Sequence, residues 1–152
     1  MSAEARLAAA GITLPEPPAP VAAYVPFVRS GALVFISGQL PLRDGGLPRT
    51  GLVGANVSLE DATEDARWCA INILAQARAA AGSLDNVARV VRLGVFVASA
   101  PGFRAQPAVA NGASELFLEI FGETGRHARA AVGVSELPLG APVEIDAIIE
   151  LT

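Results

Sequence analysis

The order in which helix-like and strand-like hydrophobic patterns follow one another constrains the fold of this 152-residue chain more than any other feature. Apolar residues recur at helical spacing from Ser58 to Gly82 and again from about Pro107 to Phe121. Strands are predicted, in chain order, at Val25–Arg29, Leu33–Ser37, Val87–Ala98, Arg129–Leu137 and Val143–Leu151. The resulting order, β-β-α-β-α-β-β, predicts an α+β fold with one mixed sheet and two helices packed on one of its faces.

Residues suited to caps and turns mark the ends of these predicted elements. Ser58 can cap the first long helix, acidic residues follow in its first turns, and Gly82 ends it. Ser30 and Gly31 form a hairpin signal between the first two strands. Local signals and hydrophobic spacing therefore agree on the elements.

The first twenty residues predict a short helix and a proline-rich arm within a single domain of residues 1–152. Residues 2–10 are rich in alanine and stop at Gly11, and four prolines then stand between Pro15 and Pro20, which enforces an extended path across a surface. The N-terminus begins with an acidic residue and lacks the long apolar stretch of a secretory signal. We therefore expect a cytoplasmic location, and no apolar run approaches the roughly 20 residues that span a bilayer.

The composition favours an oligomer. Hydrophobic residues make up 52% of the chain, charged residues 17% and aromatic residues 5%, so small aliphatic side chains must fill the core and few charges remain for the surface. The predicted helices cover one face of the sheet, and only the short N-terminal helix is left for the other face. A partner subunit is the simplest cover for that face.

Charge and residue counts argue against several classes of function. The net charge is -4, no basic stripe exists, and four acidic residues crowd the segment 60–66, so nucleic-acid binding is not expected. One cysteine and one histidine cannot form an intramolecular disulfide or a two-histidine metal site. The glycine-rich phosphate loops, dinucleotide fingerprints and nucleophile elbows of common enzymes are missing. We therefore expect no metal and no membrane partner.

A few side chains stand out as candidates for chemistry. Cys69 falls within the apolar pattern of a helix and is interpreted as a small buried side chain, and His127 is interpreted as a solvent-exposed loop histidine. Arg129 begins an apolar strand, where it could form a surface ion pair or clamp an anion through two parallel hydrogen bonds. Glu144 and Asp146 share one face of the last strand. They are interpreted either as solvated surface charges or as a site where one of the two carboxylates orients a water or accepts its proton.

Several of these segments together resemble the RidA/YjgF family of reactive intermediate deaminases. The resemblance extends from Tyr24 to Ile149, and its most specific parts are Gly31–Pro41, Ala128–Val134 and Val143–Ala147. It implies a chorismate-mutase-like fold and a homotrimer whose sheets form a central barrel, with three clefts between neighbouring subunits. Family members act without a metal or an organic cofactor, because an imine needs little covalent help to hydrolyse.

The resemblance also implies roles for individual residues. Arg129 matches the arginine that grips the carboxylate of a 2-imino or enamine acid, and Glu144 matches the glutamate that positions the attacking water. The remaining matches are to residues that line the cleft or approach the ligand, namely Tyr24, Ser37, Gly38 and Asn111. Two departures stand beside the arginine, where Ala130 and Ala131 replace a small polar residue and a cysteine, and this makes the chain a divergent member.

Three functions follow as alternatives. The first is hydrolysis of 2-imino acids, such as 2-iminopropanoate, to 2-oxo acids and ammonia. The second is a non-catalytic module that binds small carboxylates or 2-oxo acids, which the apolar replacements at Ala130 and Ala131 favour. The third is the endoribonuclease or translation-initiation-inhibitor role that family members often carry by name, and the acidic balance of the chain argues against it.

Overall fold

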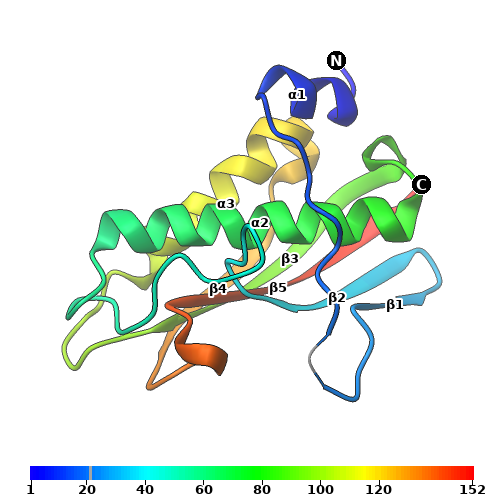
Figure 1. Ribbon diagram of the computed structural model, residues 1–152. Helices are drawn as coiled ribbons and strands as arrows, with labels where there is room; N and C mark the ends of the chain where they lie inside the picture. The colour runs from blue at the N-terminus through cyan, green and yellow to red at the C-terminus, as the bar shows by residue number, and fades with distance from the viewer. Residues whose placement is uncertain (21) are drawn as a thin grey trace.

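The computed structural model describes residues 1–20 and 22–152. Its five strands form a sheet, which lies beneath the long helices in Figure 1. The strands are β1 (Phe27–Ser30), β2 (Leu33–Gln39), β3 (Val87–Ala98), β4 (Ala128–Val134) and β5 (Val143–Leu151). The helices are α1 (Ala3–Ala9), α2 (Leu59–Ala81) and α3 (Gln106–Phe121), with 3-10 turns at Leu84–Asn86, Gly122–Gly125 and Pro138–Gly140. The strand order is β1-β2-β5-β3-β4, and only the β3–β4 pair is parallel.

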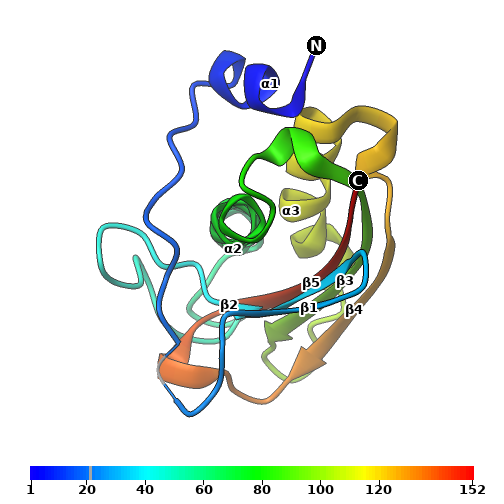
Figure 2. The ribbon, with the colours of Figure 1, turned by 90° about the vertical axis from the view of Figure 1, so that its right-hand side faces the viewer.

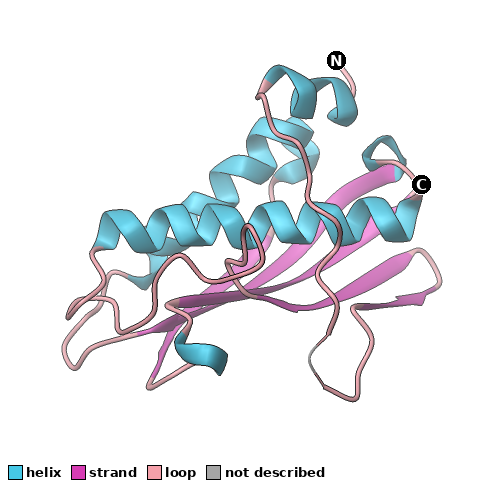
Figure 3. Cartoon of the chain, in the orientation of Figure 1, coloured by secondary structure: helices cyan, strands magenta, loops and turns pink. Residues whose placement is uncertain are grey.

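The structure confirms the predicted α+β architecture with both long helices on one face of a mixed sheet (Figures 2 and 3). Three predicted strands differ from the observed ones by two or more residues at one end. β2 runs on to Gln39 rather than ending at Ser37. β1 begins at Phe27 rather than Val25, because Pro26 cannot donate to a strand ladder. β4 ends at Val134 rather than Leu137, because Ala98, the residue paired with Val134, is the last residue of the parallel partner β3.

The core lies between the sheet and helices α2 and α3. Ser58 Oγ accepts a hydrogen bond from Asp61 N at 3.1 Å, and Gly82 ends α2 in the left-handed conformation at φ 80°, as the sequence predicts. The helices approach each other closely at Gly112, where an added Cβ would collide with the backbone carbonyl oxygen of Thr63. Small residues on both helices therefore let the two backbones nearly touch.

The proline-rich arm crosses α2, as predicted, on its way from α1 to β1 (Figure 1). Gln76, which is fully buried on α2, donates a hydrogen bond from Nε2 to Pro18 O at 2.8 Å. Glu4 of α1 forms an ion pair with Arg78 and accepts a hydrogen bond from Leu84 N at 2.9 Å. The hydrogen bond from Arg78 is the main cause that lowers the pKa of Glu4. These contacts tie the N-terminal segment to the C-terminal half of α2.

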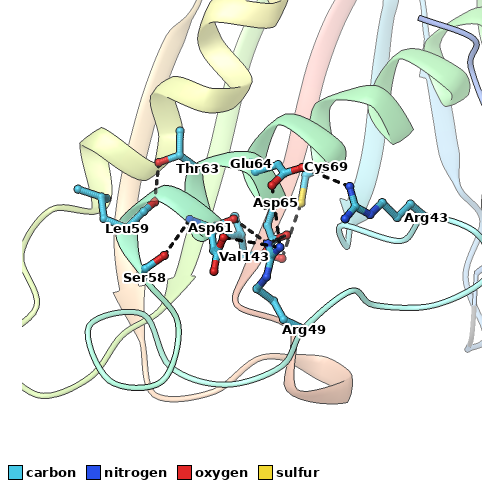
Figure 4. A network of polar contacts seen from close by, with 10 residues as sticks. All are labelled: Arg43, Arg49, Ser58, Leu59, Asp61, Thr63, Glu64, Asp65, Cys69 and Val143. Carbon is cyan, nitrogen blue, oxygen red and sulfur yellow. Dashed lines mark hydrogen bonds and ion pairs between the residues drawn. The ribbon is translucent and has the colours of Figure 1, made fainter.

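The long loop between β2 and α2 is held by arginines against the N-terminal half of α2 (Figure 4). Arg49 donates a hydrogen bond to Asp61 O at 2.9 Å and forms an ion pair with Asp65, whose side chain is fully buried. Burial raises the pKa of Asp65, although the hydrogen bond from Arg49 acts in the opposite direction. Arg43 forms an ion pair at 3.3 Å with Glu64, the residue directly before Asp65 on the same helix.

The second face of the sheet carries exposed apolar side chains. Val28, Phe35 and Val132 are 53%, 44% and 45% exposed. Figure 2 shows α2 and α3 together on the other side of the sheet. The alternation of burial along β5 separates the two faces, with Val143 and Ile145 toward the helices and Glu144 and Asp146 toward this second face. We call it the open face. Of the helices within residues 1–20 and 22–152, none combines the length and apolarity needed to cross a membrane.

Gly112→Ala should destabilise the protein even though alanine favours a helix by about 1 kcal/mol over glycine. The new methyl group has to push α3 away from the Thr63 carbonyl, and overpacking of this kind costs about 1–3 kcal/mol. Urea unfolding measures the change in the free energy of unfolding. Gly46→Ala, where an added Cβ meets no atom within 4 Å, is the matched control and should leave that free energy nearly unchanged. A stabilised Gly112→Ala variant would contradict the close packing of the two helices.

Candidate functional site

The six candidate residues form two separate groups in the chain. Arg129 on β4 and Asn111 on α3 lie together at one edge of the sheet. The other four candidates, Tyr24, Ser37, Gly38 and Glu144, lie on or beside β1, β2 and the central strand β5. Strand β3 separates β4 from β5. The structure therefore brings the candidates together in two halves.

The first half is a guanidinium group held by neutral acceptors on α3. Arg129 Nη1 donates to Asn111 Oδ1 at 2.9 Å and to Ser114 Oγ at 3.0 Å, and Nη2 donates to Pro107 O at 3.4 Å. Asn111 and Ser114 stand three residues apart on one face of the helix, so both side chains reach the same nitrogen. The side chain of Arg129 remains exposed.

Arg129 keeps its charge available for an anion. Among residues 1–20 and 22–152, no carboxylate lies within ion-pair distance of its guanidinium group. A surface ion pair, one of the two interpretations of this residue, is therefore not formed with any described residue. Because a guanidinium group has five N–H donors, the three hydrogen bonds to α3 leave donors for a carboxylate.

The second half is a carboxylate above a strand backbone. A Cβ added at Gly38 would collide with Glu144 Oε1, so only glycine at this position lets the carboxylate lie over β2. The pairing of β2 with β5 shifts register between Ile36 and Gln39, which includes Gly38. Tyr24 and Gly38 line the same shallow cavity, together with Pro18 and Pro20 of the arm. The hydroxyl group of Ser37 donates to Val25 O at 2.8 Å.

Glu144 is partly buried, and its surroundings raise its pKa. Burial is the main cause that raises the pKa of Glu144, and the negative charge of Asp146 raises it further. Asp146 has its own partner in Arg92, at 3.8 Å on the open face. In the described parts of the chain, no group donates a hydrogen bond to the Glu144 carboxylate, which leaves both oxygens available to a water or a ligand.

The two halves face opposite sides of the sheet. Arg129 pairs in register with Leu93, which points into the core, so the Arg129 side chain starts on the helix side. Glu144 pairs with Phe96 and belongs to the alternate set of β5 residues, which points to the open face. The two residues are also two strands apart, about 10 Å across the sheet. Arg129 and Glu144 of one chain therefore cannot grip the same small molecule.

The two replacements beside Arg129 lie on different faces. Ala130 is exposed and pairs in register with Gly94, on the open face. Ala131 is partly buried, packs against the core and shares the helix side with Arg129. Neither position offers a polar side chain to a ligand held by the arginine.

The structure confirms the interpretation of the single cysteine but not that of the single histidine. Cys69 is fully buried and lies 3.7 Å from Val143 O, and burial raises the pKa of its thiol well above the ordinary value, which confirms a structural role. His127 lies in a loop, as interpreted, but the expectation that it is solvent-exposed is wrong. Its ring is partly buried, packs edge-on against Phe117 and bonds to Ser114 Oγ at 2.8 Å. His127 directly precedes β4, and its side chain points toward α3, where Ser114 and Phe117 lie.

Ser114 is the residue at this site that the sequence reasoning missed. It bonds to both Arg129 and His127, yet a single serine in the middle of a helix gives no signal by itself. The available signal was its spacing, because Ser114 lies three residues after Asn111 and therefore on the same helix face. Within the described residues, no group of three or more His, Cys, Asp or Glu side chains could hold a metal ion.

Comparison with known proteins identifies the family. Residues 4–151 match the family model described as "YjgF/chorismate_mutase-like, putative endoribonuclease". The chain belongs to the RidA/YjgF family. It is similar to Protein TCP17 from Trypanosoma cruzi, with 51% identity over 97% of this chain and 92% of the relative. It is also similar to a 2-iminobutanoate/2-iminopropanoate deaminase from Salmonella typhimurium, with 33% identity over 86% of this chain and 89% of that enzyme.

Solved structures support the same fold. The crystal structure of the protein Atu1372 from Agrobacterium tumefaciens is 52% identical, covers 99% of this chain and 92% of its own, and superimposes with a TM-score of 0.91. The chorismate-mutase-like fold that the sequence resemblance implied is therefore confirmed. This RidA/YjgF protein carries Arg129 on the edge strand β4 and Glu144 on the central strand β5 of its sheet.

Proposed function

We propose that this RidA/YjgF protein is a cytoplasmic homotrimer that hydrolyses 2-imino or enamine acids, such as 2-iminopropanoate, to 2-oxo acids and ammonia. The observation that carries the proposal is the state of Arg129, a guanidinium group fixed by three neutral acceptors and without a carboxylate partner among the described residues. Such a group suits the carboxylate of a small acid. The relatives named as 2-iminobutanoate/2-iminopropanoate deaminases support this choice of substrate.

The proposed reaction needs two groups. Arg129 binds the substrate carboxylate through two parallel hydrogen bonds, which fixes the C=N carbon. Glu144 accepts a proton from a water whose oxygen attacks that carbon and passes this proton to the imine nitrogen, which gives a tetrahedral carbinolamine. The hydroxyl proton of the carbinolamine then moves through Glu144 to the nitrogen as the C–N bond breaks, so ammonia leaves and the 2-oxo acid remains. The raised pKa of Glu144 suits a group that accepts a proton and then returns it.

The two halves of the site support a cleft between protomers. Since Arg129 and Glu144 of one chain point to opposite sides of the sheet, the proposal takes Arg129 and Asn111 from one protomer. Tyr24, Ser37, Gly38 and Glu144 then come from its neighbour. The exposed Val28, Phe35 and Val132 give the open face an apolar surface that the other protomers of a barrel-like trimer would bury.

A second candidate function is a non-catalytic module that holds small carboxylates or 2-oxo acids. Ala130 and Ala131 favour it, because no polar side chain beside Arg129 is left to assist the reaction. The endoribonuclease description attached to the family has less support, since a net charge of -4 repels a phosphate backbone.

Arg129→Ala should lower kcat/KM for the deamination of 2-iminopropanoate by roughly 10–100-fold. Charge-assisted hydrogen bonds contribute about 1.5–3 kcal/mol, and about 1.4 kcal/mol corresponds to a tenfold change in rate. The imino acid is generated in situ from alanine by an amino-acid oxidase, and its decay and the released ammonia are followed. Arg104→Ala, which removes an exposed arginine outside the site, is the matched control.

The outcomes separate the two candidate functions. Acceleration by the wild type and by Arg104→Ala, lost in Arg129→Ala, is the result expected of a deaminase. A different result supports the binding module in place of the deaminase. In that case neither the wild type nor any variant accelerates the reaction, but pyruvate raises the melting temperature of the wild type and not of Arg129→Ala. Equal activity of the wild type and Arg129→Ala would contradict the role of Arg129.

The acid limb of the kcat/KM profile should lie above pH 4.5, the ordinary value for a glutamate, because the pKa of Glu144 is raised. Below its pKa the protonated carboxyl group cannot accept a proton from water, so the rate falls as the pH is lowered. Asp146→Asn removes the neighbouring charge and should shift the limb to lower pH. Glu144→Gln should abolish the limb together with most of the activity. A limb that stays in Glu144→Gln would assign the titration to another group.

A further inference from the structure

Arg129 stands at the end of a chain of hydrogen bonds that runs through Ser114 and His127 to the backbone. Arg129 Nη1 donates to Ser114 Oγ at 3.0 Å, and Ser114 Oγ lies 2.8 Å from His127 Nε2. The other ring nitrogen, Nδ1, lies 2.6 Å from Gly125 O. Three side chains from α3, β4 and the segment between them are therefore linked in one line that begins at the proposed carboxylate site.

The backbone carbonyl oxygen of Gly125, at the far end of this chain of hydrogen bonds, determines where each hydrogen lies. A carbonyl oxygen can only accept, so His127 Nδ1 carries the ring hydrogen and Nε2 of the neutral ring presents a lone pair. The hydroxyl hydrogen of Ser114 then points to Nε2. The lone pairs of Ser114 Oγ are left facing Arg129, which is the orientation that a guanidinium donor needs.

The surroundings of His127 keep the ring neutral. Burial is the main cause that lowers the pKa of His127, and the positive charge of Arg129 on β4 lowers it further, against the hydrogen bond to Gly125. Phe117 of α3 packs edge-on against the ring with centroids 6.0 Å apart. The remaining charged group beside it, Arg126, is paired with Glu123 of the 3-10 turn at 3.0 Å. No carboxylate in the described parts of the chain bonds to His127 to favour its charged form.

We propose that Ser114 and His127 are positioning residues of the carboxylate site, which act by holding the Arg129 guanidinium in the orientation that binds the substrate. The inference rests on the proposed function and deepens it. His127 Nε2 accepts the hydrogen bond from the Ser114 hydroxyl group, so Ser114 Oγ is free to act as an acceptor. Ser114 Oγ and Asn111 Oδ1 then both accept hydrogen bonds from Arg129 Nη1, and the plane of the guanidinium group is fixed before a ligand binds.

The alternative behaviour of Ser114 explains why His127 matters. A serine hydroxyl within a helix can turn back and donate to the carbonyl of the preceding turn. The hydroxyl oxygen would then be a poorer acceptor for Arg129. The arginine side chain has large rotamer freedom, so the ligand itself would have to order it. Since Arg129 grips the carboxylate in the ground state and the transition state alike, loss of this order raises KM and leaves kcat nearly unchanged.

A spectroscopic test depends on the chain having one histidine. Nitrogen-15 spectra of the full-length protein, produced without a histidine tag, report the tautomer and the titration of His127 alone. The expected result is a hydrogen on Nδ1, a bare Nε2 and a pKa below 6.5 that rises in Arg129→Ala, because a neighbouring positive charge is lost. A hydrogen on Nε2 at neutral pH, or a titration unaffected by Arg129→Ala, would overturn the inference.

A kinetic test separates positioning from a merely structural role. Ser114→Ala and His127→Ala should raise KM for 2-iminopropanoate about tenfold and leave kcat within about twofold, the effect of a lost hydrogen bond that orders the binding group. Ser114→Thr keeps the hydroxyl group, and His127→Gln offers an amide oxygen near the place of Nε2, so both should recover most of the lost affinity. Glu115→Ala, an exposed neighbour on α3, is the control and should match the wild type.

Failure of this inference differs from failure of the proposed function. Variants at Ser114 and His127 that lose thermal stability but keep the wild-type KM would show a structural role only. A wild type without turnover would defeat the proposed function, and the pyruvate Kd of the same variants would then decide the positioning role. An unchanged Kd in Ser114→Ala and His127→Ala would overturn it.

Discussion

The alternation of side chains along a strand is the constraint on which the candidate site depends. On β4 and β5 it sends Arg129 to the helix side and Glu144 to the open face, two strands away. No rotamer change can bring these groups together, because the sheet itself lies between them. The same alternation gives the open face its exposed Val28 and Phe35. In the proposed trimer, the surface that a neighbouring protomer buries and the Glu144 half of the site therefore lie on the same face. Assembly and function are thereby linked in the proposal.

The fold was largely predictable because its signals are local. Hydrophobic spacing and the caps at Ser58 and Gly82 gave α2, and β3 and β5 have the predicted bounds. Three strand ends were wrong by two or more residues, and two of them were wrong for reasons outside the hydrophobic pattern. Pro26 delays β1, and β4 stops where its parallel partner stops, which depends on a pairing that the sequence does not display.

The site was predictable only in part, and the errors arose where tertiary contacts decide. The motif gave Arg129, Glu144 and Asn111, but not the opposite faces on which the arginine and the glutamate lie. His127 was misjudged because a residue before a strand usually faces solvent, whereas here α3 supplies Ser114 and Phe117 as neighbours. Ser114 itself carries no signal until α3 and β4 are seen side by side. A polar network between distant elements is therefore the part that sequence reasoning could not reach.

Complementation between two inactive variants tests the central claim, that each site takes Arg129 from one protomer and Glu144 from another. Arg129→Ala and Glu144→Gln protomers are co-expressed, the mixed oligomers are isolated with two different tags, and deaminase activity is compared with that of each variant alone. A mixed trimer with shared sites has one intact site out of three, so about a third of the wild-type activity should return in the isolated mixed oligomers. Arg129→Ala mixed with Asn111→Ala, which damages the same half of the site, should gain no activity from mixing. If the mixed Arg129→Ala and Glu144→Gln oligomers also recover nothing while the wild type is active, the site is not shared in this way.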